Sequence, residues 1–239
     1  MPEHALEPGR QIIAALLNLG SALGYVVQPE YELPHSTAAV DVAWLREPEL
    51  ARRLRPSVFQ RGLGGGAVIV YGMNVSADGY VVDAEGSIDF TEPSEDVFSY
   101  WIGVQRAAVL DVYGRALYET MRYWEAPSAE ASDADRAFAD AWQKTPKIVV
   151  STTLESVEPY AKLVRDPAHV ADAEGPVHIG GATLAAAMID RVDEFWPIVY
   201  PVAVGGGAPF FPAGARLNLK LVETKRFDSG PVLLRYQRS

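Results

Sequence analysis

The sequence predicts an α/β protein built on a mixed, mostly parallel sheet flanked by helices. From Ala67 onwards, short runs rich in Val and Ile alternate with helical segments, which is typical of a parallel sheet. Two apolar runs, 217–227 and 231–237, flank the turn signal Asp228-Ser229-Gly230, so a C-terminal hairpin adds antiparallel pairing. Three predicted strands end in glycine or hydroxyl residues, and ligands of open α/β sheets bind at such strand ends.

The composition favours a globular protein inside the cell. Of the 239 residues 49% are hydrophobic, and the mean hydropathy is +0.00. Even the apolar stretch 12–23 is short and interrupted, so no run reaches membrane-spanning length. The start of the chain lacks the pattern of a signal peptide, and the absence of cysteine removes disulfides and thiolate chemistry. We therefore expect a cytoplasmic protein.

The charge pattern excludes several classes of partner. A net charge of −10 argues against broad binding to nucleic acid or to anionic membranes, since either needs a basic face. A small anionic cofactor stays possible where a few arginines and helix ends create a local positive site. The histidines show no ligand spacing, so we expect no metal site; they are His4, His35, His169 and His178.

The first 65 residues are expected to form a small αββ appendage of unknown role. Helical spacing in 12–23 is followed by two strand-like runs that carry Glu30, Glu32 and Asp41. This order resembles the opening of a PD-(D/E)XK nuclease domain, but the Glu-x-Lys of that family is missing before Gly66. Nuclease activity is therefore the least favoured alternative. The basic, Gly-rich stretch 52–66 is typical of a linker.

The second unit, 66–239, opens with a strand, a turn and a helix. The strand 67–71 leads towards Asp78-Gly79, which is a strong turn signal at the end of a strand. Ser94 can cap a helix with an acidic first turn. The apolar run 107–113 then passes directly into Gly114 and a second helix, which makes a strand-glycine-helix junction.

The later elements repeat this arrangement. A helix ending near Gln143 precedes a strand at 148–153, which ends in Ser151, Thr152 and Thr153. After a variable loop, a buried strand ends at Gly180-Gly181 and a helix of small residues follows. The run 193–204 indicates a long strand whose prolines imply an irregularity or an exposed edge.

The Gly180-Gly181 junction places a helix start at the carboxyl end of a strand. The unpaired N–H groups and the positive dipole end of such a start suit a phosphate, and glycine lets the phosphate come close. A plain strand-to-helix turn is the alternative. If three such strand ends meet at one edge of the sheet, they form a crevice for a ligand, which favours the phosphate site over the plain turn.

Taken together, six short motifs resemble the dihydrofolate reductase-like superfamily, above all the C-terminal reductase domain of the bifunctional riboflavin-biosynthesis deaminase/reductase. They occur in the order of that family: Met73–Gly79, Gly114–Glu119, Val149–Thr152, Ile179–Leu184, Val192–Glu194 and Pro201–Phe211. Two features depart from its pattern. Leu117 stands where the family often has a hydroxyl residue, and 163–176 is too short for a helix usually found there.

The resemblance implies that NADPH lies across the carboxyl edge of the sheet of a homodimeric enzyme. It assigns the pyrophosphate to backbone N–H groups. It assigns either the phosphates or the adenosine 2′-phosphate to Arg115, beside Gly114. It places Ser151 and Thr152 along the adenosine, and Asp78 with Gly79 near the nicotinamide and substrate. Asp78 is the candidate for positioning the substrate or helping to deliver its proton. Gly206 either borders the nicotinamide pocket or belongs to a flexible turn. The residues assigned to the pyrophosphate are Gly180, Gly181, Ala182 and Thr183.

The favoured function is therefore hydride transfer from NADPH to a small pterin-like or riboflavin-precursor-like acceptor, such as 5-amino-6-(5-phosphoribosylamino)uracil. A catalytically silent nucleotide-binding or assembly domain is the first alternative, because no acid sits in an unmistakable catalytic motif.

Overall fold

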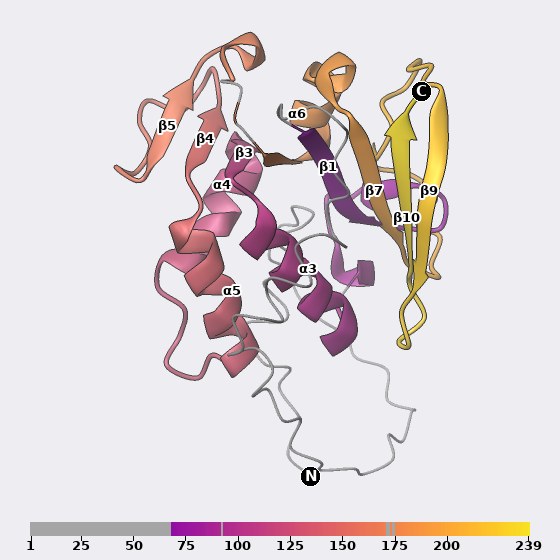
Figure 1. Ribbon diagram of the computed structural model, residues 1–239, viewed down its shortest axis with the longest axis horizontal. Helices are drawn as coiled ribbons and strands as arrows, with labels where there is room; N and C mark the ends of the chain where they lie inside the picture. Colours follow the sequence, from indigo (N-terminus) through magenta and orange to yellow (C-terminus); the bar gives the residue numbers. More distant parts are fainter. Residues whose placement is uncertain (1–67, 92, 171–172, 174) are drawn as a thin grey trace.

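The computed structural model describes residues 68–91, 93–170, 173 and 175–239 (Figure 1). Its strands form an eight-stranded sheet of order β5-β4-β3-β6-β1-β7-β10-β9 and a small two-stranded sheet of β2 and β8. The strands are β1 Val68–Val75, β2 Tyr80–Val82, β3 Leu110–Gly114, β4 Lys147–Val150, β5 Ala161–Val164, β6 Pro176–Gly180, β7 Glu194–Val199, β8 Ala208–Pro209, β9 Leu219–Arg226 and β10 Val232–Arg238. The helices are α3 Glu95–Ala107, α4 Arg115–Met121, α5 Asp133–Lys144 and α6 Ala182–Ala187. Short 3₁₀ turns are η2 Asp89–Thr91, η3 Arg122–Glu125, η4 Pro167–His169 and η5 Ile189–Arg191.

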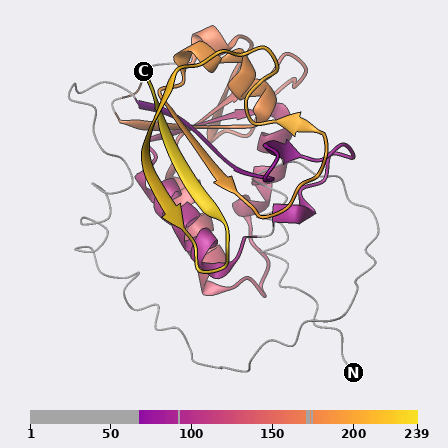
Figure 2. The same ribbon diagram turned by 90° about the vertical axis from the view of Figure 1, so that its right-hand side faces the viewer.

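The large sheet is mixed, as the sequence predicts. Strands β5, β4, β3, β6, β1 and β7 run parallel, whereas β10 pairs antiparallel with β7 and β9 antiparallel with β10. The C-terminal hairpin of β9 and β10 therefore continues the sheet at one side (Figure 2).

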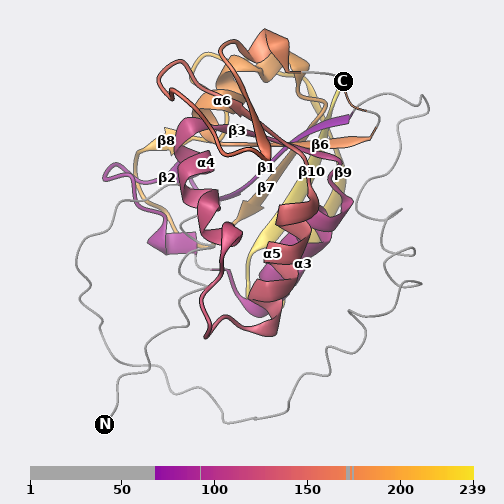
Figure 3. The ribbon, with the colours of Figure 1, turned by 90° about the vertical axis from the view of Figure 1, so that its left-hand side faces the viewer.

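Two hydrophobic clusters cover the two faces of the sheet. Val70 points to the cluster that holds α3, α4 and α5, whereas its neighbours Ile69 and Tyr71 point to the cluster around α6. This alternation follows from the period of two along a strand. Figure 3 shows α3 and α5 side by side, with α6 on another side of the sheet. Parallel strands buried on both faces explain why the strand runs are continuously apolar.

The helix starts differ in how their free N–H groups are satisfied. At α5, the Ser132 hydroxyl accepts a hydrogen bond from Asp135 N, and the Asp135 carboxylate accepts one from Ser132 N. This reciprocal cap closes the helix without help from a ligand. The other end of α5 leads into β4.

Several element boundaries differ from those predicted. The strand expected at 193–204 ends at Val199, and its proline, Pro197, does not lie at an edge, because β7 is paired with β1 and β10. The irregularity is real, since the β7–β10 register has no pair at Pro197. β5 and the β2–β8 pair lie in segments that the sequence indicates as loops.

The N-terminal predictions fall outside the described residues. They include the αββ appendage of 1–65, its linker and the carboxylates Glu30, Glu32 and Asp41. The division of the chain at 65/66 therefore stays a prediction.

The β2–β8 pairing gives a stability test at adjacent glycines. Gly207 has φ +128°, and a Cβ on it would lie 1.9 Å from the Val82 carbonyl oxygen, whereas a Cβ on Gly206 would meet nothing within 4 Å. We expect Gly207→Ala to lower the free energy of unfolding by at least about 1–3 kcal/mol, because of backbone strain and steric overlap. Gly206→Ala is the matched control and should leave it nearly unchanged. Urea unfolding measures both, and equal midpoints would contradict the packing described here.

Candidate functional site

The parallel register brings three strand ends together at one edge of the sheet. Tyr113 of β3 pairs with Gly180 of β6, and Gly114 of β3 pairs with Val150 of β4. The residues that follow these ends are Arg115, Ser151 and Gly181, so the sequence-predicted junctions are neighbours. The convergence expected from the sequence is thus present in the fold.

Two helices begin at this edge without a side-chain cap from any described residue. Gly114 is the N-cap of α4, and Gly181 is the N-cap of α6. The helices approach from opposite faces: Leu117 of α4 lies against Gly180, and Leu184 of α6 lies against Gly114. First-turn N–H groups of both helices are therefore available at adjacent strand ends, which is an arrangement that favours anions.

Glycine is required at the β6–α6 junction for two separate reasons. A Cβ on Gly180 would lie 2.3 Å from Leu117 Cδ2, so the close approach of α4 depends on the missing side chain. Gly181 has φ +99°, a conformation that other residues adopt only with strain. Leu117, which replaces a hydroxyl residue of the resembled family, thus makes a packing contact in place of a polar one.

Arg115 is the positive charge at this edge. It is the first residue of α4 and is exposed, and no described residue forms an ion pair or hydrogen bond with its guanidinium. Its predicted contact with phosphates stays a prediction. Thr183 and Ala182 lie in the first turn of α6, where Thr183 is exposed and Ala182 half-buried.

Ser151 organises the turn after β4. Its hydroxyl accepts hydrogen bonds from Thr153 N at 3.2 Å and Leu154 N at 3.0 Å, while its carbonyl accepts one from Arg165 at 2.9 Å. Thr152, by contrast, is exposed at the edge. Arg165 follows β5, a strand that the sequence analysis missed, so this second arginine, near the end of β4, was missed as well.

Asp78 joins the two loops that follow β1 and β7. Its carboxylate accepts hydrogen bonds from Val204 N at 3.1 Å and Gly205 N at 2.7 Å. Bonds from Ser76 and Gly205 lower the pKa of Asp78 to about 2. A carboxyl group with this pKa carries no proton at neutral pH, so the geometry favours positioning over proton delivery. Gly79, at φ +86°, completes the turn beside it.

Gly206 lies in the loop that Asp78 holds. Open space surrounds it, because an added Cβ would have no neighbour within 4 Å among the described residues. Its position between Gly205 and Gly207 keeps it close to the end of β7, at the same side of the sheet as the helix starts.

A row of ionisable side chains crosses the sheet beneath α3 and α5. Lys147 of β4, Asp111 of β3 and His178 of β6 are register partners and are all buried. Gln105 of α3 donates to Asp111 Oδ2 at 2.8 Å. The Lys147 ammonium donates to the carbonyl oxygens of Trp142 and Thr145, and burial lowers the pKa of Lys147 to about 8 although Asp111 opposes this shift. Sequence reasoning missed this row, although each polar residue interrupts an apolar strand.

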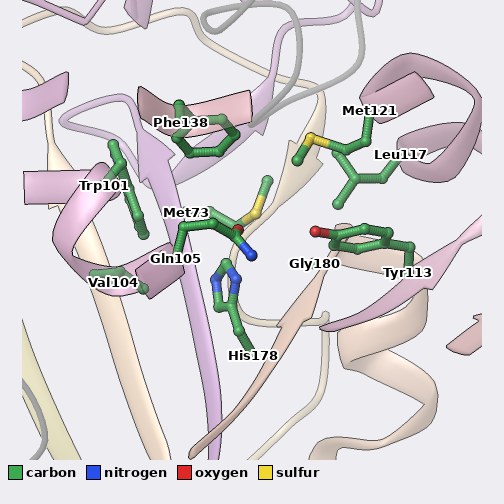
Figure 4. Close-up of a pocket in the computed structure, with 10 residues that line it drawn as sticks. All are labelled: Met73, Trp101, Val104, Gln105, Tyr113, Leu117, Met121, Phe138, His178 and Gly180. Carbon is green, nitrogen blue, oxygen red and sulfur yellow. The ribbon is translucent and has the colours of Figure 1, made fainter. Parts of the chain in front are cut away.

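A small cavity of about 20 Å³ lies between the sheet and the three helices α3, α4 and α5 (Figure 4). Its wall is mostly apolar, but Gln105, Tyr113 and His178 add polar atoms, and Gly180 connects it to the carboxyl edge. Figure 4 shows the Tyr113 hydroxyl and the Gln105 amide directed at the same region as the His178 ring. A cavity of this size accommodates one water molecule.

Other acidic residues near the strands have structural partners. Asp193 accepts a hydrogen bond from Ile69 N at 2.8 Å, and Glu194 forms a buried ion pair with Arg235 at 3.0 Å. The two residues thus tie β7 to its neighbours. In the described segments, no three His, Asp or Glu side chains group closely enough to hold a metal ion. No helix in these segments is long and apolar enough to cross a membrane.

The Asp78 contacts give a prediction for pH. Because its folded pKa of about 2 lies below the ordinary value of 3.8, the contact is at full strength above about pH 4 and is lost as the pH falls towards 2. We expect the ¹³C signal of the Asp78 carboxyl and the amide protons of Val204 and Gly205 to titrate together with a midpoint of about 2. In Asp78→Asn the amide protons should not titrate. A midpoint near pH 4, or amide signals that do not titrate with the carboxyl group, would contradict the hydrogen bonds from Val204 and Gly205 to Asp78.

No protein-family model matches the chain. The Bacillus subtilis (strain 168) protein YyaP is 26% identical over 181 residues, which cover 70% of this chain and 93% of YyaP.

Three solved structures superpose on this chain and share its fold. A riboflavin biosynthesis protein described as putative, from Shewanella sp. PV-4, superposes with a TM-score of 0.55 at 19% identity, over 73% of this chain and 99% of that one. The Thermotoga maritima diaminohydroxyphosphoribosylaminopyrimidine deaminase/5-amino-6-(5-phosphoribosylamino)uracil reductase gives 0.51 at 12%, over 73% of this chain and 57% of the other. Dihydrofolate reductase from Enterococcus faecalis, complexed with NADP(H) and RAB-propyl, gives 0.50 at 14%, over 72% and 96%. The chain has the fold of the dihydrofolate reductase-like superfamily.

Proposed function

We propose that this protein is an NADPH-dependent reductase that transfers a hydride to a small conjugated acceptor. The observation that carries the proposal is the pair of uncapped helix starts at adjacent strand ends, one of which begins with the exposed Arg115. One of these helices alone would not indicate a phosphate site, because the uncapped start of a short helix is a common structural feature. We infer that the N–H groups of Gly181, Ala182 and Thr183 and the Arg115 side chain act together on a diphosphate, since oriented N–H groups and a guanidinium both favour phosphate oxygens.

The similar structures support the same chemistry. The Enterococcus faecalis dihydrofolate reductase is complexed with NADP(H), and the Thermotoga maritima protein is named a reductase of 5-amino-6-(5-phosphoribosylamino)uracil. Both share this fold. The chain spans 57% of the Thermotoga protein, whose name gives both a deaminase and a reductase activity. The activity that we propose for this chain is the reductase activity alone.

The residues present fit this cofactor. Bound NADPH would supply the hydride, and the chain would supply binding, alignment and exclusion of water. Gly181 would let the backbone approach the diphosphate, whereas Gly180 and Gly114 face the packed side chains of Leu117 and Leu184. Thr152 and Arg165 flank the end of β4, where the adenosine would lie. Asp78 would hold the loops at Gly79 and Gly206 in place around the nicotinamide and acceptor.

The acceptor would bind beside the nicotinamide, next to the end of β1. Pterin-like compounds and riboflavin precursors such as 5-amino-6-(5-phosphoribosylamino)uracil are the proposed class, since both are small, planar and polar at their edges. We further propose a homodimer as the functional form and the cytoplasm as its location. The resemblance supports the homodimer, and the composition without cysteine supports the cytoplasmic location.

A silent nucleotide-binding or assembly domain is the second candidate. The observation that favours it is the state of Asp78, whose carboxylate is ionised and engaged with two backbone N–H groups, so that it holds no proton for an acceptor. The nuclease alternative depends on residues outside the described part of the chain, and no described feature supports it.

Arg115 provides the sharpest test of the cofactor site. We expect Arg115→Ala to weaken NADPH binding by roughly tenfold to a hundredfold, since a charge-assisted hydrogen bond contributes about 1.5–3 kcal/mol. Arg136→Ala is the matched control, because Arg136 is also exposed but lies on α5, where it pairs loosely with Asp133 at 3.9 Å. Calorimetric titration with NADPH and NADH measures the affinities.

Three outcomes separate the candidates. Binding that is weakened by Arg115→Ala but not by Arg136→Ala, with NADPH oxidation on a panel of pterin and pyrimidine acceptors, supports the reductase. The same binding without oxidation by any acceptor favours the silent domain. Failure of the unsubstituted protein to bind either nucleotide removes both.

A further inference from the structure

Arg165 is fixed at the end of β5, beside the turn that Ser151 organises. Its Nη1 donates hydrogen bonds to the carbonyl oxygen of Ser151 at 2.9 Å and to that of Leu154. β5 runs parallel to β4, and Val164 pairs with Val150. Arg165 and Ser151 are therefore the first residues beyond the ends of two neighbouring strands. The guanidinium thus has a defined place at the carboxyl edge of the sheet.

The other N–H groups of this guanidinium have no partner among the described residues. Both bonds to the turn start from Nη1, so Nε and Nη2 form no hydrogen bond or ion pair there. Arg165 is exposed, and the carboxylate of its neighbour Asp166 accepts a hydrogen bond from Ala168 N at 2.8 Å. A guanidinium that is anchored on one side and open on the other presents parallel N–H groups, which is the geometry with which arginine binds phosphate.

The order of the strands separates the two halves of a bound dinucleotide. This step rests on the proposed function, in which the diphosphate lies at the ends of β3 and β6. The loops that Asp78 joins follow β1 and β7, on one side of these two strands, whereas β4 and β5 lie on the other side. With the nicotinamide beside Asp78, the adenosine would extend over β4 towards β5. Arg165 lies two strands from β3, which is about 10 Å at ordinary strand spacing.

The adenosine ribose is where NADPH and NADH differ. NADPH carries a 2′-phosphate there in place of a hydroxyl group. Sites for the free hydroxyl use a carboxylate at the ribose, whereas a nearby arginine accommodates the 2′-phosphate. The charged group that is anchored to the turn after β4 is Arg165, and the exposed Thr152 and Thr153 add hydroxyl groups to the same turn. This set of donors suits a phosphate dianion.

We propose that Arg165 is the residue that selects NADPH over NADH, by donating hydrogen bonds from Nε and Nη2 to the 2′-phosphate. Arg115, at the start of α4, would then contact the diphosphate, which both nucleotides share. The two arginines thus have separable roles. Arg115 contributes to the affinity for either nucleotide, and Arg165 to the preference between them. The carbonyl oxygen of Ser151 holds the Arg165 guanidinium in place before the nucleotide binds, which limits the entropy lost on binding.

Calorimetric titration of the full chain with NADPH and NADH tests this assignment. The unsubstituted protein should bind NADPH more tightly than NADH. We expect Arg165→Ala to weaken NADPH binding roughly tenfold to a hundredfold and NADH binding less than about twofold, because only NADPH carries the 2′-phosphate. Arg115→Ala should weaken the binding of both nucleotides by a similar factor. Lys162→Ala is the matched control, since Lys162 is an exposed cation within β5 itself, and it should change neither affinity.

Adenosine 2′,5′-bisphosphate gives a second readout, which does not involve the nicotinamide. The unsubstituted protein should bind it more tightly than adenosine 5′-monophosphate, and Arg165→Ala should remove this difference. Arg165→Lys should keep part of the difference, because the positive charge remains but the fork of N–H groups is lost.

The possible results separate this inference from the function on which it rests. An equal loss of affinity for NADPH and NADH in Arg165→Ala would mean that Arg165 only supports the turn after β4, and would overturn the inference. A preference for NADPH that is lost in Arg115→Ala and kept in Arg165→Ala would overturn it too. Equal binding of both nucleotides to the unsubstituted protein would contradict the role of Arg165 and leave the dinucleotide site standing. Failure to bind either nucleotide would remove the proposed function and the inference together.

Discussion

The parallel register of β4, β3 and β6 is the constraint on which the rest of the structure depends. It sets the carboxyl ends of three strands side by side, at Val150, Gly114 and Gly180. The same register also aligns Lys147, Asp111 and His178 in the interior. If one of these strands slipped by one residue, each of its side chains would turn to the opposite face of the sheet. The same register therefore determines both the site at the strand ends and the buried row of ionisable side chains.

Close packing at the edge limits which residues can occupy it. Leu117 fills the space that a side chain at position 180 would need, and it brings α4 against the end of β6. The helix start of α4 is thereby held near that of α6. On the other side, Asp78 holds the loop at Gly205 close to the turn after β1. Both sides of the edge are thus fixed by contacts that leave the backbone N–H groups between them free for a ligand.

The sequence predicted the layout of the fold better than its details. Alternation of strand and helix periods identified the mixed sheet, because these periods are local properties of the chain. The strand β1 proved longer than predicted, since its polar residue Asn74 is satisfied by distant partners, Trp101 at 3.0 Å and Tyr200 at 3.4 Å. Local sequence carries no sign of such partners. β5 was missed for a related reason, because four residues are too few to show a period.

The candidate site was predicted as a set of positions, and its chemistry only in part. Glycine and arginine at strand ends are visible in sequence, so Gly114, Arg115 and Gly181 could be named. The hydrogen bond that Gly205 donates to Asp78 spans 127 positions along the chain and could not be foreseen. The buried row was hidden because a single Asp or His within an apolar run does not reveal whether its neighbours across the sheet are polar.

The central claim is that the two helix starts form one site for a diphosphate. Amide chemical-shift mapping during titration with NADPH tests it most directly. The account predicts large shifts at the N–H groups of Arg115, Gly181, Ala182 and Thr183, with the amides at the start of α5 unmoved. Shifts confined to other parts of the chain, or none at saturating NADPH, would contradict it.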